Sequence, residues 1–311
     1  MTPLKRASVR DLWFLSLVML IFAGFGKDFA SLVRFSFAND LYSYIILIPV
    51  VSVALAARQK DAIFRDVGWG WGPGIGLMAA GLAGAVLQRR FWHADPAASL
   101  AATMLCALAL LTGTFALCYG KRAVRAAAFP ILFLILIVPV PARMLDAASL
   151  LLQRASYELT YGMITGAGVP VLRHGFVLSL QAGSIFIGPE CSGIRSTLGL
   201  LVGGIVAGHL FLRSFWKKVL LGFLVVPVSI FKNALRITTL YYLGVHTDQR
   251  FLTGELHRIG GIPFSLIALA ILGPLLWALR KSEFKVMEVK VEAAASKSAL
   301  ILPAAGPVLG E

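Results

Sequence analysis

The sequence predicts an all-α integral membrane protein, with a bundle of about eight transmembrane helices and a small extracytoplasmic β-hairpin. Composition and pattern both support this class. Hydrophobic residues make up 58% of the 311 residues and charged residues only 14%, well below the roughly 25% of soluble domains. Apolar runs recur along the whole chain with nearly the length, about 20 residues, that a helix needs to cross a bilayer.

This class also limits the partners that we expect. The net charge of +14 is not taken as a nucleic-acid signal, because lysines and arginines in loops mark the cytoplasmic side of membrane proteins. Three cysteines do not predict a disulfide framework, since Cys106 and Cys118 would lie about 18 Å apart along one helix. We expect the lipid bilayer as a partner, and no nucleic acid, metal, cofactor or cleavable signal peptide.

Eight apolar runs are predicted to span the membrane, separated by short loops. The third run is rich in glycine, which allows close helix packing. The fifth ends at Pro139-Val140-Pro141, and the seventh carries Pro227 near its middle, where we expect a kink. The predicted spans are residues 12–26, 43–57, 73–87, 97–119, 127–140, 192–211, 219–242 and 259–279.

The pattern changes between the fifth and sixth spans. Residues 142–166 form an otherwise apolar helix with a polar stripe of period 3.6. Two interpretations stay open: an interfacial helix with a wet face, or a helix whose polar stripe lines a site. Residues 169–187 contain short β-rich runs between glycine turns, which predict a small hairpin or meander. The polar stripe consists of Asp146, Ser149, Gln153, Ser156 and Thr160.

Loop charge predicts the topology. With eight spans both termini lie on one side, and 17 of the 29 lysines and arginines fall there, against 9 in the opposite loops. The positive-inside rule therefore places both termini in the cytoplasm. We expect a single transmembrane domain over residues 1–281 and a disordered cytoplasmic tail over residues 282–311, which ends in an Ala/Pro/Gly-rich segment.

Cys191 lies where an irregular polar segment meets the apolar helix of the sixth span, on the predicted outer face. We expect Ser192 to be the N-cap of that helix. A cysteine at a helix N-terminus faces unpaired N–H groups and the positive end of the macrodipole. Both favour the thiolate, which is the nucleophile. The alternative role for a cysteine is that of a small hydrophobe, and this is our interpretation of Cys106 and Cys118.

Two further elements are predicted to meet Cys191 at the outer surface. Asn233 and Arg236 are three residues apart and hence on one helix face. An arginine within a span is costly and indicates a functional site, although it can also snorkel to the interface. Lys232 is interpreted as a snorkelling lysine. His257, just before the eighth span, is the candidate general acid and base.

Several other residues stay open as contributors. Two outward-facing histidines rival His257, whereas His209 lies near the cytoplasmic end of the sixth span and cannot reach Cys191. Arg195 is either a second cation near the thiolate or a partner of Glu190. The rival histidines are His174 and His246.

Three motifs together resemble the exosortase/archaeosortase family. They are Cys191-Ser192-Gly193-Ile194-Arg195-Ser196, then Pro227 with Asn233-Ala234-Leu235-Arg236-Ile237, then His257 before a glycine-rich last span. Pro139-Val140-Pro141 and Gly168-Val169-Pro170-Val171 resemble the family's approach to the cysteine, so the likeness covers residues 129–261. It implies Cys191 as nucleophile, Arg236 as electrostatic stabiliser and His257 as acid/base, of the bacterial type. Asn233, Arg195 and Ser192 are supporting candidates.

The resemblance implies a membrane-embedded cysteine transpeptidase of the cytoplasmic (inner) membrane, with its active site on the extracytoplasmic face. Its partners would be exported proteins with a C-terminal sorting tail of the PEP-CTERM kind: a short motif, a transmembrane helix and a basic cluster. The enzyme would cleave the tail through a Cys191 thioester and transfer the protein to an acceptor, such as a polysaccharide or a lipid. Two other functions stay open. One is an intramembrane cysteine protease that only hydrolyses, and the other is a non-enzymatic transporter with Arg236 and Lys232 along its pathway.

Overall fold

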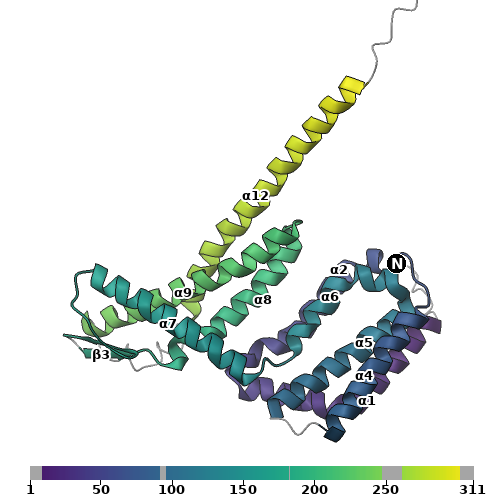
Figure 1. Cartoon of the computed structure of the whole chain (residues 1–311), viewed down its shortest axis with the longest axis horizontal. Coiled ribbons are helices and arrows are strands. Elements are labelled where there is room, and N and C mark those ends of the chain that lie inside the picture. The colour runs from purple at the N-terminus through teal and green to yellow at the C-terminus, as the bar shows by residue number, and fades with distance from the viewer. Residues whose placement is uncertain (1–8, 92–95, 182, 247–260, 302–311) are drawn as a thin grey trace, which may run out of the picture. The chain divides into compact units, whose positions relative to one another are not determined.

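The structure, a computed structural model, describes residues 9–91, 96–181, 183–246 and 261–301, and among these it describes no side chains at 246, 261–262 and 284–301. The chain divides into two compact units, residues 1–148 and 149–311. Helices make up most of both units, and a small sheet belongs to the second (Figure 1).

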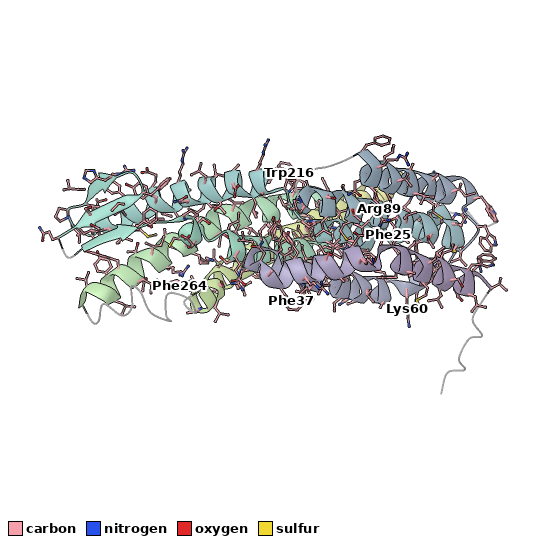
Figure 2. All side chains as sticks on the ribbon, turned by 90° about the horizontal axis from the view of Figure 1, so that it is seen from below. Phe25, Phe37, Lys60, Arg89, Trp216 and Phe264 are labelled. Atoms are coloured by element: carbon pink, nitrogen blue, oxygen red, sulfur yellow. The ribbon has the colours of Figure 1, made fainter. Side chains whose placement is uncertain are left out.

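Unit 1 is built from helices alone in its described part. Arg89 of α4 pairs with Asp28 of α1 at 2.9 Å and lies over the ring of Phe25, 5.3 Å from its centroid (Figure 2). This ion pair links α4 to α1. The helix α1 ends at Ala38, well past residue 26, where the first span is predicted to end. The elements are α1 (Val9–Ala38), η1 (Asp40–Ile46), α2 (Leu47–Arg58), α3 (Lys60–Ile63), α4 (Trp71–Phe91), α5 (Pro96–Ala126), α6 (Ala128–Phe133) and η2 (Leu134–Ile137).

Glycines let α4 and α5 approach closely. A Cβ added at Gly74 would lie 2.6 Å from the Cα of Leu117, and one at Gly81 would lie 2.9 Å from the carbonyl oxygen of Cys106. Neither position therefore accepts a larger residue without moving a helix. The close packing predicted from the glycine-rich third run is confirmed at these two positions, whereas Gly76 has nothing within 4 Å.

Unit 2 holds most of α7 and the elements after it. Its strands form an antiparallel meander in the order β1-β2-β3, with Leu172 opposite Ser179 and Val177 opposite Phe186. The predicted hairpin or meander is thus confirmed as three strands. The elements are α7 (Ala142–Gly166), β1 (Leu172–His174), β2 (Val177–Leu180), β3 (Gly183–Phe186), η3 (Pro189–Ser192), α8 (Ile194–Phe211), α9 (Phe215–His246) and α12 (Gly261–Ile301).

One apolar core joins α7, the meander and α9. Along β2, Leu178 and Leu180 are buried while Val177 and Ser179 are only half-buried, the alternation expected of a strand with one face on a core. Cys191 packs against the edge of this core, which we call the unit 2 core. Its buried members are Tyr157, Ile164, Leu178, Leu180, Ile187, Ile237 and Tyr241.

The last helix is longer than the sequence predicts. Residues 282–301 belong to α12 rather than to a disordered tail, and Ala, Glu and Lys in this stretch are strong helix formers. The Glu283 carboxylate accepts hydrogen bonds from the backbone N–H groups of Arg213 and Ser214, each at 2.9 Å. It thereby ties α12 to the connection between α8 and α9.

Six helical segments in the described residues are long and apolar enough to cross a membrane. Residues 128–137 and α7 qualify only as a pair, bent by 89° at the Pro139–Pro141 break. The chain is therefore a multi-pass α-helical membrane protein, but the predicted count of eight spans is not reached in this part of the chain. α4 is not among the six, because its many glycines lower its hydropathy. The six are Val9–Ala38, Asp40–Arg58, Pro96–Ala126, Pro189–Phe211, Phe215–Val245 and Pro263–Glu283.

Candidate active site

Cys191 lies in η3, the short turn between β3 and α8. Pro189 opens this turn, and its ring fixes φ where the chain leaves the strand. The N–H of Cys191 donates to the carbonyl of Gly188 at 2.9 Å. The Cys191 side chain is half-buried and touches the unit 2 core. The thiol is therefore held at the boundary between a packed interior and the surface of the unit.

The cap of α8 differs from the sequence prediction. Gly193, with φ +72°, is the N-cap of α8, so the prediction of Ser192 in that position is wrong. The chain needs a left-handed residue to pass from η3 into α8, and glycine adopts that conformation without strain. The Ser192 hydroxyl is buried and accepts a 3.4 Å hydrogen bond from the N–H of Ile194, so it still serves the first turn.

Arg236 reaches this site from α9. Its side chain is half-buried, and its charge and the Cys191 sulfur interact electrostatically. The hydrogen bond from Asn233, three residues before Arg236, to the carbonyl of Cys191 places this part of α9 beside the turn of Cys191, although Asn233 and Cys191 are 42 residues apart in the sequence. Glu190, which is exposed on η3, also interacts electrostatically with Cys191.

Asn233 connects three elements beside the thiol. Its side chain is only 1% exposed. Its amide nitrogen donates to the carbonyl of Cys191 at 2.5 Å and to the hydroxyl of Ser156, on α7, at 3.0 Å. Two side chains of α9 thus act on Cys191: Arg236 interacts electrostatically with its sulfur, and Asn233 hydrogen-bonds to its backbone carbonyl.

Lys232 is a buried residue, not a snorkelling one. Its side chain is 2% exposed, and its ammonium group donates to the hydroxyl of Ser196 on α8. The charge of Arg236, one turn further along α9, acts on it as well. The sequence interpretation is wrong because the partner of this lysine belongs to a neighbouring helix, which a single-helix pattern does not reveal.

The polar stripe of α7 faces the segment that carries Cys191. The amide nitrogen of Gln153 donates to the carbonyl of Ile187 at 2.6 Å, and the Ser149 hydroxyl donates to that of Ser192 at 3.0 Å. Gln153 and Ser156 are buried. Of the two interpretations left open by the sequence, these contacts favour a helix that lines a site over an interfacial helix with a wet face. Asp146, at the start of the stripe, is exposed.

The remaining candidates lie on α8 and β1 or outside the described residues. Arg195 is exposed on α8, and His174 is exposed on β1, the edge strand opposite β3. His209 lies in the last turn of α8. His257 and the side chain of His246 lie outside the described residues. Within the described part of the chain, no three His, Cys, Asp or Glu side chains come together as metal ligands.

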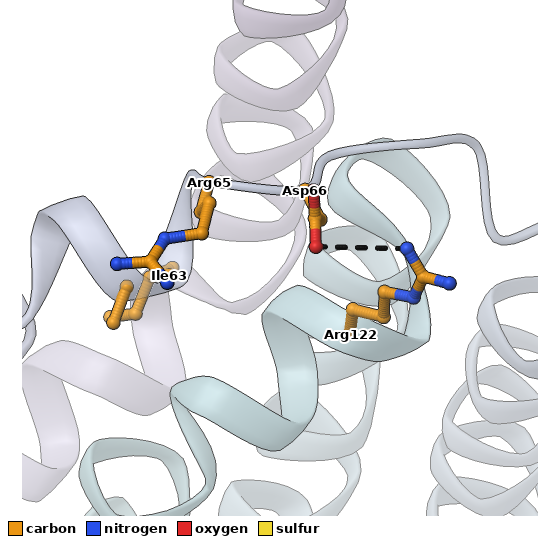
Figure 3. A pocket seen from close by; sticks show the side chains of 5 residues that line it. Ile63, Arg65, Asp66 and Arg122 are labelled. Atoms are coloured by element: carbon orange, nitrogen blue, oxygen red, sulfur yellow. Dashed lines mark ion pairs between the residues drawn. The ribbon is translucent and has the colours of Figure 1, made fainter. Parts of the chain in front are cut away.

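A pocket in unit 1 is unrelated to these candidates. Ala62, Ile63, Arg65, Asp66 and Arg122 line it (Figure 3). Arg122 and Asp66 form an ion pair at 3.6 Å, and both side chains are well exposed to solvent. Such surface pairs contribute little, and none of the sequence-predicted site residues lines the pocket.

The fold and the site define a multi-pass membrane protein with a half-buried thiol beside a buried cationic helix face. The chain matches the family described as Transmembrane exosortase (Exosortase_EpsH) over residues 34–274. It therefore belongs to the transmembrane exosortase family. This match extends in both directions beyond residues 129–261, where the motifs show the resemblance. Searches of curated proteins and of solved structures found no match to the chain.

Proposed function

We propose that this exosortase is a protein-sorting cysteine transpeptidase, with Cys191 as nucleophile, Arg236 as electrostatic stabiliser and His257 as acid/base. The observation that carries the proposal is the approach of α9 to the Cys191 turn: Asn233 donates to the carbonyl of Cys191, and Arg236, three residues further along the helix, interacts electrostatically with the sulfur. Membership of the exosortase family supports the same chemistry. Ser192 and Asn233 hold the turn that carries Cys191 through their hydrogen bonds to the backbone. Arg195 is a further supporting candidate.

The reaction has two steps. In the first, the Cys191 thiolate attacks the carbonyl carbon of the scissile peptide bond, and Arg236 stabilises the negative charge on the carbonyl oxygen. The C–N bond breaks as His257 protonates the leaving amine, which leaves the substrate on Cys191 as a thioester. In the second step, an amine or hydroxyl of the acceptor attacks the thioester, gives its proton to His257 and releases the thiolate.

The substrates are exported proteins with a C-terminal sorting tail, consisting of a short motif, a transmembrane helix and a basic cluster. The tail helix lies in the bilayer beside the enzyme, with its basic end in the cytoplasm. The enzyme resides in the cytoplasmic (inner) membrane with both termini inside and Cys191 facing outward. A membrane-impermeant maleimide added to intact spheroplasts is expected to label Cys191. Labelling that requires permeabilised membranes would contradict this orientation.

Replacement of the nucleophile tests the activity. Cells with Cys191→Ala are expected to accumulate a tail-bearing substrate at full length, whereas cells with Cys106→Ala process it as the wild type does. If Cys191→Ala still removes the tail, the mechanism is wrong. The mass of the new C-terminus then separates transfer from hydrolysis, because transfer adds the acceptor and hydrolysis leaves a carboxylic acid.

A further inference from the structure

Two of the cations on α9, Lys232 and Arg236, lie one turn apart, and Lys232, which the proposed reaction does not use, is the more deeply buried of the pair. Lys232 is 2% exposed, whereas Arg236 is half-buried. Like charges four residues apart on a helix repel each other, and a charge within a span is costly and marks a functional position. The position of Lys232 therefore calls for an explanation beyond packing.

The contacts of Lys232 lead to the end of the nucleophile's turn. Its ammonium group donates to the Ser196 hydroxyl, and that hydroxyl donates to the carbonyl of Gly193 at 2.9 Å. The side chain and the N–H of Thr197 reach the same carbonyl. Lys232 thus orients the Ser196 hydroxyl, which is one of the groups that bind the carbonyl of Gly193.

The contacts of Asn233 lead to the start of the same stretch. Its amide donates to the carbonyl of Cys191 at 2.5 Å. Gly193 packs directly on it, because a Cβ there would lie 3.0 Å from both Cγ and Oδ1 of Asn233. Two adjacent residues of α9 therefore hold residues 191–193 at both ends, one directly and one through Ser196.

We propose that Lys232 and Asn233 form a positioning pair that ties the Cys191–Gly193 turn to α9, the helix that bears Arg236. The Cys191 sulfur and the Arg236 guanidinium then keep a fixed relative position, because α9 carries Arg236 and also holds the turn that carries Cys191. Reacting groups need such fixed geometry, and small displacements reduce the rate strongly. The consequence for catalysis rests on the proposed function, whereas the consequence for the Cys191 turn does not.

The catalytic test uses two variants that change no charge. Ser196→Ala removes the link from Lys232, and Asn233→Leu removes the direct hydrogen bond. Each is expected to lower kcat for tail removal by about tenfold to hundredfold, because a displacement of about 1 Å in a positioned reacting group can cost about a hundredfold in rate, with KM within about twofold of wild type. Phe231→Leu is the matched control, because Phe231 lies on the same turn of α9 but is 40% exposed. Wild-type kcat in both test variants would overturn the proposal.

A double-mutant cycle separates positioning from charge. If Lys232 acts through Ser196, adding Lys232→Met to Ser196→Ala lowers kcat little further, because both changes break one chain of contacts. If Lys232→Met is slow while Ser196→Ala keeps wild-type kcat, Lys232 acts through its charge on Arg236, and the positioning pair is wrong. Ser196→Ala deletes a single oxygen, so the cycle remains informative even if Asn233→Leu fails to fold.

A measurement without substrate keeps the two proposals distinguishable. The rate at which N-ethylmaleimide labels Cys191 in membranes, read by peptide mass spectrometry, is expected to rise at least about threefold in Ser196→Ala and Asn233→Leu. A loosened turn opens more often, and a half-buried group reacts from the open state. Cys106, in unit 1, is the internal reference and keeps its rate. Faster labelling in both variants, combined with a wild-type protein that processes no tail-bearing substrate, supports the pair and overturns the proposed function. Unchanged labelling overturns the pair.

Discussion

Gly193→Ala is the change that strains the candidate site most directly. Gly193 has φ +72°, a conformation that costs other residues about 1–2 kcal/mol. The new Cβ would also lie 3.0 Å from the side chain of Asn233. If Asn233 shifts away, its hydrogen bond to the Cys191 carbonyl is lost, and an unsatisfied buried polar group costs about 1–3 kcal/mol. We expect Gly193→Ala to destabilise the protein by about 2–5 kcal/mol and to lower processing more than tenfold.

Substitutions at two other glycines distinguish the cost of backbone strain from the cost of the contact with Asn233. Gly168 has φ +81° but nothing within 4 Å of a Cβ, so Gly168→Ala is expected to cost only the strain, about 1–2 kcal/mol. Gly199 lies within α8 and also has open space around it. Gly199→Ala is therefore expected to stabilise the helix by up to about 1 kcal/mol.

The assay is unfolding of the detergent-solubilised variants, followed by intrinsic fluorescence, with tail processing measured in membranes. We expect stability to fall in the order Gly199→Ala, wild type, Gly168→Ala, Gly193→Ala. Processing is expected to fall selectively in Gly193→Ala. If Gly193→Ala matches Gly168→Ala in stability and processes substrate normally, the contact with Asn233 does not hold the nucleophile's turn.

Three further predictions concern the packing that supports the site. Leu178→Ala empties a fully buried position and is expected to cost about 2–5 kcal/mol in unfolding, whereas Leu172→Ala, at a site 69% exposed, changes stability by less than about 0.5 kcal/mol. Arg173→Ala removes the ion pair and the ring contacts that hold β1 to α7, so limited proteolysis is expected to cleave the meander faster, and an unchanged cleavage rate would count against this anchor. Gly74→Leu is expected to separate α4 from α5 and to reduce the monodisperse fraction in size-exclusion chromatography, while Gly76→Leu leaves that fraction unchanged.

Composition and periodicity predict the class of the fold because the bilayer imposes them. The long apolar runs, the glycine-rich contact at Gly74 and the meander at residues 172–186 all follow from local pattern. The number of spans does not follow as directly. Residues 128–137 and α7 form a membrane-spanning candidate only as a pair with a sharp bend at the prolines between them. Hydropathy alone does not show whether such a pair is one bent span or two separate helices.

The candidate site is predictable in its chemistry and less so in its geometry. An arginine within a span and a cysteine at a helix start are signals in the sequence, and in the structure α9, which carries Arg236, bonds to the carbonyl of Cys191 through Asn233. The role of Lys232 depends on Ser196, which lies on another helix, so no local pattern reveals it. The N-cap of α8 is Gly193 because the chain adopts a left-handed φ there. The sequence pattern favours Ser192 instead, because serine is a common N-cap residue.

The most direct test of the central claim is the detection of substrate on Cys191. Membranes that contain the enzyme and a tail-bearing substrate are quenched in acid, and peptides are analysed by mass spectrometry. We predict that the substrate, cleaved at its tail, is joined to the peptide containing Cys191 by a bond that neutral hydroxylamine breaks, as it does a thioester. Removal of the tail with Cys191 unmodified, or an adduct on another residue, would contradict the account.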